Sequence, residues 1–177
     1  GQASVLKKSM SKLIESLKIK ITQVFKSKKY LNNKKSLEKQ TKDEQDKLFY
    51  SLKEEALKND ISISETANGI TITPLKEGKL LSSEEYNLLD TKKREIIDKN
   101  IISYQERVDE NIKLEQDLSN KFLEEIKEVD KKFVSEVLKK SLKTLKEKFV
   151  SYEKVLLFLN DVEIDILEHY TYFVKIE

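Results

Sequence analysis

Apolar side chains recur every three or four residues along most of this 177-residue chain, which is the spacing of one helix face. The pattern predicts a first helix over residues 5–25 and a second over 36–58, with a break between them near Asn32–Asn33. A much longer helix is expected over residues 90–149, because no glycine or proline interrupts its apolar seam. A final helix is expected from residue 151 towards 173.

One short stretch instead alternates apolar and polar residues, which is the period of a β-strand. Residues 61–65 and 70–73 are predicted to pair as an antiparallel hairpin, because Asn68 and Gly69 between them tolerate the positive φ of a tight turn. Pro74 has no N–H to donate to a neighbouring strand, so the second strand is expected to end there. A lone hairpin is marginal in water, so its apolar face must pack on a helix or another partner.

A helix start follows the hairpin. Ser82 and Glu85 have the spacing of a capping box, and Leu81 and Tyr86 have that of a hydrophobic staple. Long helices with narrow apolar seams need a partner, and the N-terminal helical arm running back antiparallel is the expected one. The expected fold class is therefore mainly α, an elongated helical or antiparallel coiled-coil bundle with one small β-hairpin.

Composition and charge narrow the classes of function. The chain has no Cys and one His, which excludes a disulfide framework, a thiolate site and an all-histidine metal site. Residues 1–47 carry 13 basic and 5 acidic side chains, whereas residues 151–177 carry 2 and 6. This asymmetry suggests head-to-tail packing of the two ends, or separate partners. Nucleic-acid binding is disfavoured, because the basic stretch has no interleaved aromatic residues or reading motif.

No catalytic motif is present in the sequence. The three glycines stand at Gly1, Gly69 and Gly78, which excludes a phosphate-binding loop, and no zinc-protease or nucleophile-elbow motif occurs. Asp165 and His169 lie four residues apart and could in principle hold a divalent metal, but an ordinary ion pair is the favoured interpretation. We therefore assign no catalytic, cofactor-binding or metal-binding residue. No apolar run approaches the length of a membrane span.

One block of the sequence has a residue pattern that is more specific for a protein family than helical or strand periodicity is. Residues 68–79 read NGITITPLKEGK, and residues 81–86 read LSSEEY. This block resembles a Gly-Ile…Pro…Gly…Ser-x-Glu-Glu segment in the helical insertion of Lon-like AAA+ ATP-dependent proteases of the LonB/LonC type. Residues 49–56 look like the helix entering that segment. The stretches 6–14 and 155–169 are similar to the family's helices at the start and end of the insertion.

The resemblance implies that residues 1–177 form a single helical insertion module. Within it the arm would be 1–58, the hairpin and turn 59–79, the capped and long helices 80–150, and the exit helix 151–177. The family's phosphate-binding loop and Ser-Lys dyad would lie outside this chain, so ATP and Mg²⁺ are expected in the parent protease and not in this fragment. The missing initiator Met agrees with an excised piece.

The family works as a cytoplasmic hexameric ring that unfolds and cleaves damaged proteins. The resemblance therefore implies a non-catalytic domain that engages or gates unfolded substrate above the ring. Its partners would be unfolded or damaged proteins, the rest of the protease and neighbouring subunits, with no membrane and no nucleic acid. Apolar residues near the hairpin are candidate substrate or subunit contacts, unless they pack within the module against residues 80–89. These candidates are Ile61, Ile63, Ile70, Ile72 and Leu75.

Two other classes of function stay open from the sequence. A stand-alone coiled-coil scaffold or adaptor would use its apolar seam to dimerise, and its oligomeric state would depend on concentration. A basic nucleic-acid-binding arm would bind through Lys7–Lys47, with an affinity that falls steeply as salt is added.

Overall fold

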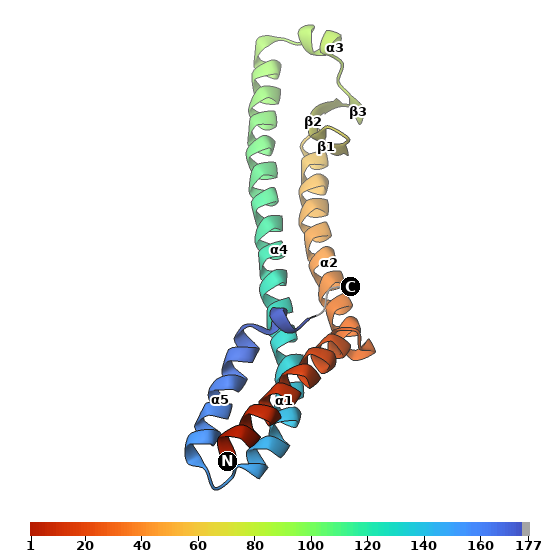
Figure 1. Cartoon of the computed structure of the whole chain (residues 1–177). Coiled ribbons are helices and arrows are strands. Elements are labelled where there is room, and N and C mark those ends of the chain that lie inside the picture. Colours follow the sequence, from red (N-terminus) through yellow and green to blue (C-terminus); the bar gives the residue numbers. More distant parts are fainter. Residues whose placement is uncertain (175–177) are drawn as a thin grey trace. The chain divides into compact units, whose positions relative to one another are not determined.

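The computed structural model describes residues 1–174, which are mainly helical with one small antiparallel sheet (Figure 1). This confirms the predicted fold class of a mainly α chain with a small hairpin. The helices are α1 (Gln2–Phe25), α2 (Lys28–Lys58), α3 (Ser83–Asn87), α4 (Thr91–Lys148), α5 (Glu153–Glu168) and the short 3-10 helix η1 (Tyr170–Phe173). The strands are β1 (Ile61–Thr66), β2 (Gly69–Lys76) and β3 (Lys79–Leu80), in the order β1-β2-β3.

The chain divides into two compact units. Unit 1 combines residues 1–38 with the chain from residue 122 onward, and unit 2 comprises residues 39–121. The long helices α2 and α4 each contribute one part to unit 1 and the other part to unit 2. The interpretation of residues 1–177 as one insertion module stays a prediction.

Unit 1 is built from α1, the end of α4 and α5. The chain begins beside the turn that joins α4 to α5 in Figure 1, so α1 packs antiparallel to the end of α4. Burial of the shared apolar faces stabilises this part of the molecule, since each fully buried Leu or Ile contributes about 1.5–3 kcal/mol. The buried core residues are Leu13, Leu17, Ile21, Val134, Leu138, Leu142, Leu145, Phe149, Leu159, Ile166 and Tyr170.

Two tyrosines share one carboxylate in unit 1. The Tyr30 hydroxyl donates to Asp130 Oδ1 and the Tyr170 hydroxyl donates to Asp130 Oδ2, each at 2.7 Å. Both tyrosines are buried, and the ring of Tyr30 meets the edges of Phe25 and Phe133 at centroid distances of 4.8 and 5.5 Å. Asp130 on α4 therefore connects the first turn of α2 with η1 through these two hydrogen bonds.

Unit 1 is expected to lose stability at alkaline pH because of these tyrosines. Burial, followed by hydrogen bonding to Asp130, raises the pKa of both phenols well above the ordinary 10.0. A phenol whose pKa is higher in the folded chain than in the unfolded chain adds to the free energy of unfolding. This contribution is complete below about pH 10, the pKa of a phenol in the unfolded chain, and it is lost as the pH rises towards the pKa of the folded state. Urea unfolding at stepped alkaline pH should show a shallower decline for Tyr30→Phe. An identical decline in the variant and the wild type would contradict the assignment.

The break between the first two helices lies earlier than predicted. The prediction of a break at Asn32–Asn33 is wrong, because α1 ends at Phe25 and α2 begins at Lys28. The Ser27 hydroxyl accepts the backbone N–H of Tyr30 at 3.3 Å and so satisfies an orphan donor at the start of α2. Asn33 stays helical while its side-chain amide donates to the carbonyl of Lys29 at 2.8 Å.

The long helix is continuous over its 58 residues, as its uninterrupted seam predicts. The predicted capping box before α3 is also confirmed. The N–H of Glu85 donates to the Ser82 hydroxyl at 3.1 Å, and the N–H of Ser82 donates to the Glu85 carboxylate at 3.0 Å. At the start of α4, Asp90 Oδ1 accepts the N–H of Lys93 at 2.9 Å.

The exit helix is shorter than predicted. The sequence predicts a helix from Ser151 towards Phe173, whereas α5 ends at Glu168. His169 has φ −116° and ψ 29°, outside the helical range, and the chain then tightens into η1. Tertiary packing explains why α5 ends early, because the change to η1 brings Tyr170 into the core of unit 1. Residues 175–177 of the predicted exit helix lie outside the described residues.

The second strand passes through Pro74 instead of ending at residue 73. Pro74 lies opposite Ile61, and at the next pair the N–H of Leu75 donates to the carbonyl of Asp60 at 2.7 Å. Because hydrogen-bonded pairs alternate along antiparallel strands, the nitrogen of Pro74 faces away from β1 and no bond to β1 is lost. The Pro74 carbonyl accepts the N–H of Leu81 at 2.9 Å, where the chain returns as β3.

Candidate protein-binding surface

The sheet of unit 2 packs on one face of the helices α2 and α4. Its register places Ile63 opposite Ile72, so the isoleucines of both strands share one face and the Ser and Thr residues share the other. The buried core consists of Leu52, Ala56, Ile61, Ile63, Tyr104 and Val108, with Phe49, Ile70, Ile72 and Ile101 packed against it.

The structure separates the five candidate contact residues by burial. Ile61 and Ile63 are buried against the helices α2 and α4, and Ile61 also lines a cavity together with Leu81 and Leu89. Ile70, Ile72 and Leu75 are half-buried. A role in contacting substrate or a neighbouring subunit stays a prediction for all five. Only the last three keep accessible side-chain surface while this packing holds.

An ion pair fixes the end of α2 against α4. The guanidinium of Arg107 donates two hydrogen bonds to the carboxylate of Glu55, at 2.5 and 2.6 Å, and stacks over the ring of Tyr104 at 5.2 Å. These hydrogen bonds hold the pKa of Glu55 below its usual value. Asn59 also donates to the Tyr104 hydroxyl at 2.8 Å. The pair positions the point where the chain leaves α2 and enters β1, and no local sequence signal identifies it.

A cavity of about 340 Å³ opens where the sheet meets the first turns of α4. Its wall is mostly aliphatic, with Lys76 and Lys93 at its margin. Leu75 is the one predicted contact residue that lines it without being part of the buried core. The aliphatic lining residues are Ile61, Leu75, Leu81, Leu89, Ile96 and Ile97.

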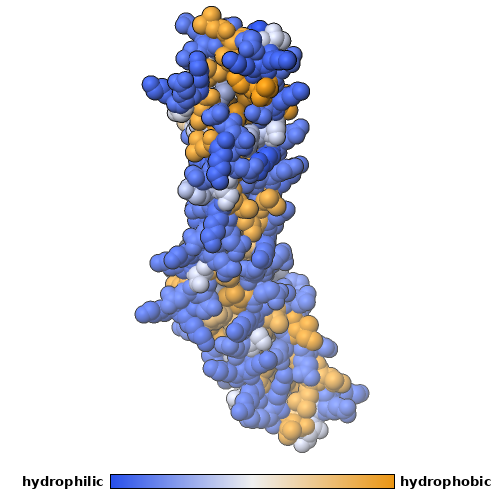
Figure 2. Space-filling model, turned by 180° about the vertical axis from the view of Figure 1, so that it is seen from behind, coloured by the Kyte–Doolittle hydropathy of each residue, from blue (hydrophilic) through white to orange (hydrophobic). Residues whose placement is uncertain are grey.

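Three large aliphatic side chains that line this cavity or directly precede a lining residue in the sequence are exposed to solvent. Leu80 on β3, Leu88 after α3 and Ile96 on α4 are 63%, 86% and 60% exposed. We call these three residues and the adjoining cavity the apolar end of unit 2, and Figure 2 shows hydrophobic side chains gathered there. An exposed apolar patch beside a cavity is typical of protein-interaction sites.

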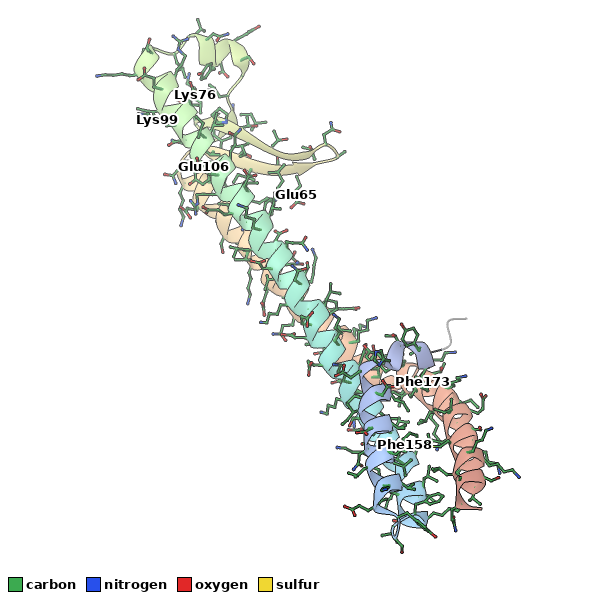
Figure 3. The ribbon with its side chains drawn as sticks, turned by 60° about the vertical axis from the view of Figure 1, so that its left-hand side comes forward. Glu65, Lys76, Lys99, Glu106, Phe158 and Phe173 are labelled. Atoms are coloured by element: carbon green, nitrogen blue, oxygen red, sulfur yellow. The ribbon has the colours of Figure 1, made fainter. Side chains whose placement is uncertain are left out.

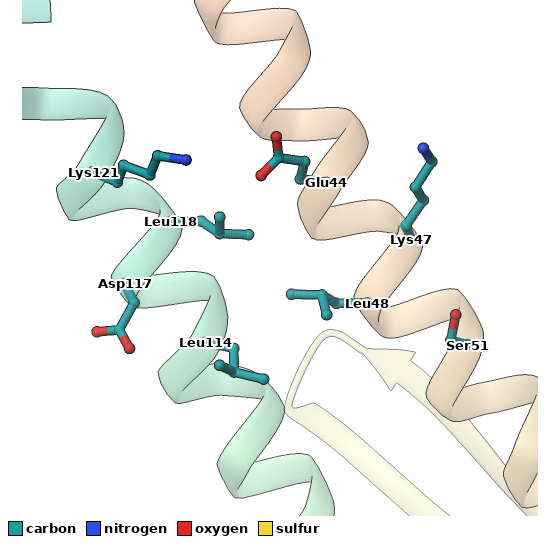
Figure 4. Close-up of a pocket in the computed structure, with 8 residues that line it drawn as sticks. All are labelled: Glu44, Lys47, Leu48, Ser51, Leu114, Asp117, Leu118 and Lys121. Carbon is teal, nitrogen blue, oxygen red and sulfur yellow. The ribbon is translucent and has the colours of Figure 1, made fainter. Parts of the chain in front are cut away.

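A second hollow lies between α2 and α4 on the same unit. It has a volume of about 450 Å³ and an aliphatic floor formed by Leu48, Leu114 and Leu118 (Figure 4). Its other lining residues include charges of both signs, with Glu44 and Lys47 on α2 and Asp117 and Lys121 on α4. This groove suits an apolar side chain but offers no group that would carry out chemistry.

Asp165 and His169, whose spacing could in principle hold a metal ion, lie at the end of α5. The Nδ1 atom of His169 lies 3.3 Å from Asp165 Oδ1 and 3.0 Å from the Asp165 carbonyl, in agreement with an ordinary ion pair on the surface. Among these described residues, no three His, Cys, Asp or Glu side chains are grouped so that they could hold a metal ion. None of the described helices combines the length and apolar character that a bilayer crossing needs.

No family model matches this chain, and comparisons with curated proteins and with solved structures find no match either.

Proposed function

We propose that this chain is a non-catalytic helical domain of an ATP-dependent Lon-like serine protease, where it engages or gates unfolded protein substrate. The observation that carries the proposal is the apolar end of unit 2, where Leu80, Leu88 and Ile96 are exposed and Ile96 lines a cavity. Folded proteins bury most of their large aliphatic side chains, whereas unfolded chains expose them. An accessible apolar surface therefore favours unfolded chains over folded ones.

The distinctive sequence block and the apolar end occupy the same part of the fold. The block, residues 68–79 and 81–86, supplies β2, the first residue of β3 and most of α3, and its residues Leu75 and Leu81 line the cavity of the apolar end. The segment that resembles the Lon-like insertion thus helps to form the cavity, whereas the exposed side chains Leu80, Leu88 and Ile96 lie outside its quoted residues. The contribution of the block to the cavity supports the proposal independently of helical periodicity, which is common to many proteins.

The proposal assigns the chemistry to other segments of the parent protease. ATP and Mg²⁺ would bind its ATPase segments, and a Ser-Lys dyad would cleave the substrate. The parent would be a cytoplasmic hexamer, with the neighbouring subunits as further partners of this domain. Within this chain the residues bind and orient substrate, and none takes part in bond cleavage.

A triple substitution at the apolar end tests the proposal. Fluorescein-labelled β-casein, a protein without a stable fold, should bind the wild-type chain in a fluorescence anisotropy titration. The combined variant Leu80→Ser, Leu88→Ser and Ile96→Ser is expected to bind about tenfold more weakly, because it removes the exposed apolar contacts while leaving the buried core intact. Native, folded lysozyme should not bind either protein.

Unit 1 offers a matched control. The combined variant Val150→Ser, Leu157→Ser and Ile164→Ser changes three side chains that are 69%, 58% and 61% exposed. It should bind β-casein as the wild type does. The proposal is wrong if the wild type does not bind β-casein, or if both triple variants lose the same affinity. A wild type that instead dimerises through its helices would favour a coiled-coil scaffold.

A further inference from the structure

The helix α5 carries apolar side chains on two opposite sides. One side packs in unit 1, where Leu159 and Ile166 are buried in the core. On the other side, Leu157 and Ile164 are 58% and 61% exposed to solvent. Successive residues of a helix are rotated by about 100°, which places residues 157 and 164 opposite residues 159 and 166. The exposure of Leu157 and Ile164 therefore belongs to a continuous outward side of α5.

A third apolar side chain widens this outward side. Phe158, which Figure 3 labels on α5, is 46% exposed. A helix with apolar residues on all sides is normally buried within a larger core. Covering such a surface removes apolar area from water, which is favourable, and exposed apolar patches of this kind are typical of interaction sites. The outward side of α5 is therefore a candidate interface with a partner.

The charged residues on the same side of α5 are acidic. Asp161 and Glu168 are seven residues apart, as Leu157 and Ile164 are, so carboxylates and aliphatic side chains alternate along one side of the helix. Asp165 has the same spacing from Phe158. We call these six residues together the outer face of α5. They are Leu157, Phe158, Asp161, Ile164, Asp165 and Glu168, and all six are exposed.

The chain itself neutralises little of this negative charge. No ion pair or hydrogen bond within residues 1–174 engages the carboxylates of Asp161 or Glu168. Asp165 lies 3.3 Å from Nδ1 of His169, and this contact is an ion pair only when the histidine is protonated. The helix α5 contains five acidic residues and a single basic one, Lys154. A partner with basic side chains beside its apolar residues complements this face, whereas an acidic partner would be repelled.

We propose that the outer face of α5 binds a basic amphipathic helix of a partner protein. The aliphatic stripe of that helix would pack against the three apolar residues of the face, and its Lys or Arg side chains would lie beside the three carboxylates. Apolar burial supplies the affinity in this mode of recognition, and the flanking charges select the partner. The inference concerns unit 1 and does not rest on the proposed function, which places the substrate at the apolar end of unit 2.

A short synthetic peptide of leucine and lysine tests the apolar part of the face. The residues are ordered so that a helix of this peptide has one leucine side and one lysine side. Labelled with fluorescein, it should bind the wild-type chain in an anisotropy titration. The variant Leu157→Ser with Ile164→Ser is expected to bind it about tenfold more weakly. Both side chains are exposed, so the core of unit 1 stays intact. Equal binding by this variant would overturn the proposal.

The charge of the face has its own test. A peptide with glutamate in place of every lysine should bind the wild type much more weakly than the lysine peptide does. The variant Asp161→Asn with Glu168→Gln keeps the size of both side chains and removes their charge. It should bind the lysine peptide about threefold more weakly, and its affinity should fall less steeply as salt is added. Equal binding of the two peptides to the wild type would refute charge complementarity, and the proposal with it.

The outcomes separate this inference from the proposed function. The variant Leu80→Ser, Leu88→Ser and Ile96→Ser should keep the wild-type affinity for the lysine peptide, because these residues lie in unit 2. Leu157→Ser with Ile164→Ser should keep the affinity for β-casein, which is negatively charged at neutral pH and is repelled by the acidic face. A wild type that binds β-casein but not the lysine peptide overturns this inference alone. The reverse result overturns the proposed function alone.

A second copy of the chain is the competing occupant of the face. Sedimentation of the wild type at increasing concentration detects it. If the chain self-associates and Leu157→Ser with Ile164→Ser abolishes the association, the outer face of α5 pairs with another copy and the inference is overturned. If the wild type stays monomeric while it binds the lysine peptide, the face is free for the proposed partner, as we expect.

Discussion

Replacing Phe149 with alanine is expected to destabilise unit 1 by about 3–5 kcal/mol. Phe149 is 1% exposed and is the largest of the fully buried side chains. It lies just after the last turn of α4, where its ring fills the core between the end of α4 and α5. Removing the ring leaves a cavity that backbone at the end of a long helix cannot easily close. Urea unfolding followed by far-ultraviolet circular dichroism measures the change in free energy of unfolding.

The neighbouring residue provides the control for this prediction. Val150 is 69% exposed, so Val150→Ala should change the free energy of unfolding by no more than about 0.5 kcal/mol. If Phe149→Ala costs no more than Val150→Ala, the core of unit 1 is not packed around Phe149.

Replacing Asp130 with alanine is expected to cost about 3 kcal/mol or more. The substitution removes the acceptor of two phenolic hydroxyls at once, and hydrogen bonds to a charged group contribute about 1.5–3 kcal/mol each. Tyr30 and Tyr170 are buried, so their hydroxyls would then lack a partner without gaining full contact with water. Thermal unfolding of unit 1 should therefore shift more for Asp130→Ala than for either Tyr→Phe change alone.

A double-mutant cycle checks that the loss comes from this contact. In a background of Tyr30→Phe, Asp130→Ala should cost less than it does in the wild type, because one of the two hydrogen bonds is already absent. Asp161→Ala removes an exposed carboxylate from α5 and should be nearly neutral. Equal costs of Asp130→Ala in both backgrounds would show that Tyr30 and Asp130 do not interact.

Features with a local cause were predictable from the sequence. The capping box of Ser82 and Glu85 joins residues three apart, and the hairpin forms around a turn with Gly69 at a positive φ. The long helix follows from an uninterrupted seam between Thr91 and Lys148. In each case the deciding interaction lies within a few residues of the chain. The start of α2 also has a local signal, the Ser27 hydroxyl that accepts the N–H of Tyr30, but the apolar periodicity does not contain it.

Features that depend on neighbours in space were not predictable. Pro74 was expected to end a strand, and only the register with β1 shows that its missing N–H faces the other way. The contact of Asp130 with Tyr30 and Tyr170 joins residues 100 and 40 positions apart. No periodicity reports such a contact, because the sequence pattern records only which residues share a face.

The exposure of residues at the candidate surface was also not predictable, even where two apolar residues are adjacent in the sequence. The pairs Leu80–Leu81 and Ile96–Ile97 each place two apolar residues side by side in the sequence. Leu80 is 63% exposed whereas Leu81 is 8% exposed, and Ile96 is exposed whereas Ile97 is half-buried. Adjacent residues point in different directions on any strand or helix, so only one of each pair can face the core. The sequence identified the hairpin region as apolar but not which of its residues are accessible.

The sequence by itself determined the helical character of this protein, the place of its hairpin and the lack of a catalytic motif within the chain. These follow from residue type and short-range spacing, which act before any long-range contact forms. The tertiary structure decided which apolar residues are exposed and how the two tyrosines share Asp130. Those properties depend on the packing of segments distant in the chain, and the free energy of such contacts has no counterpart in a local pattern.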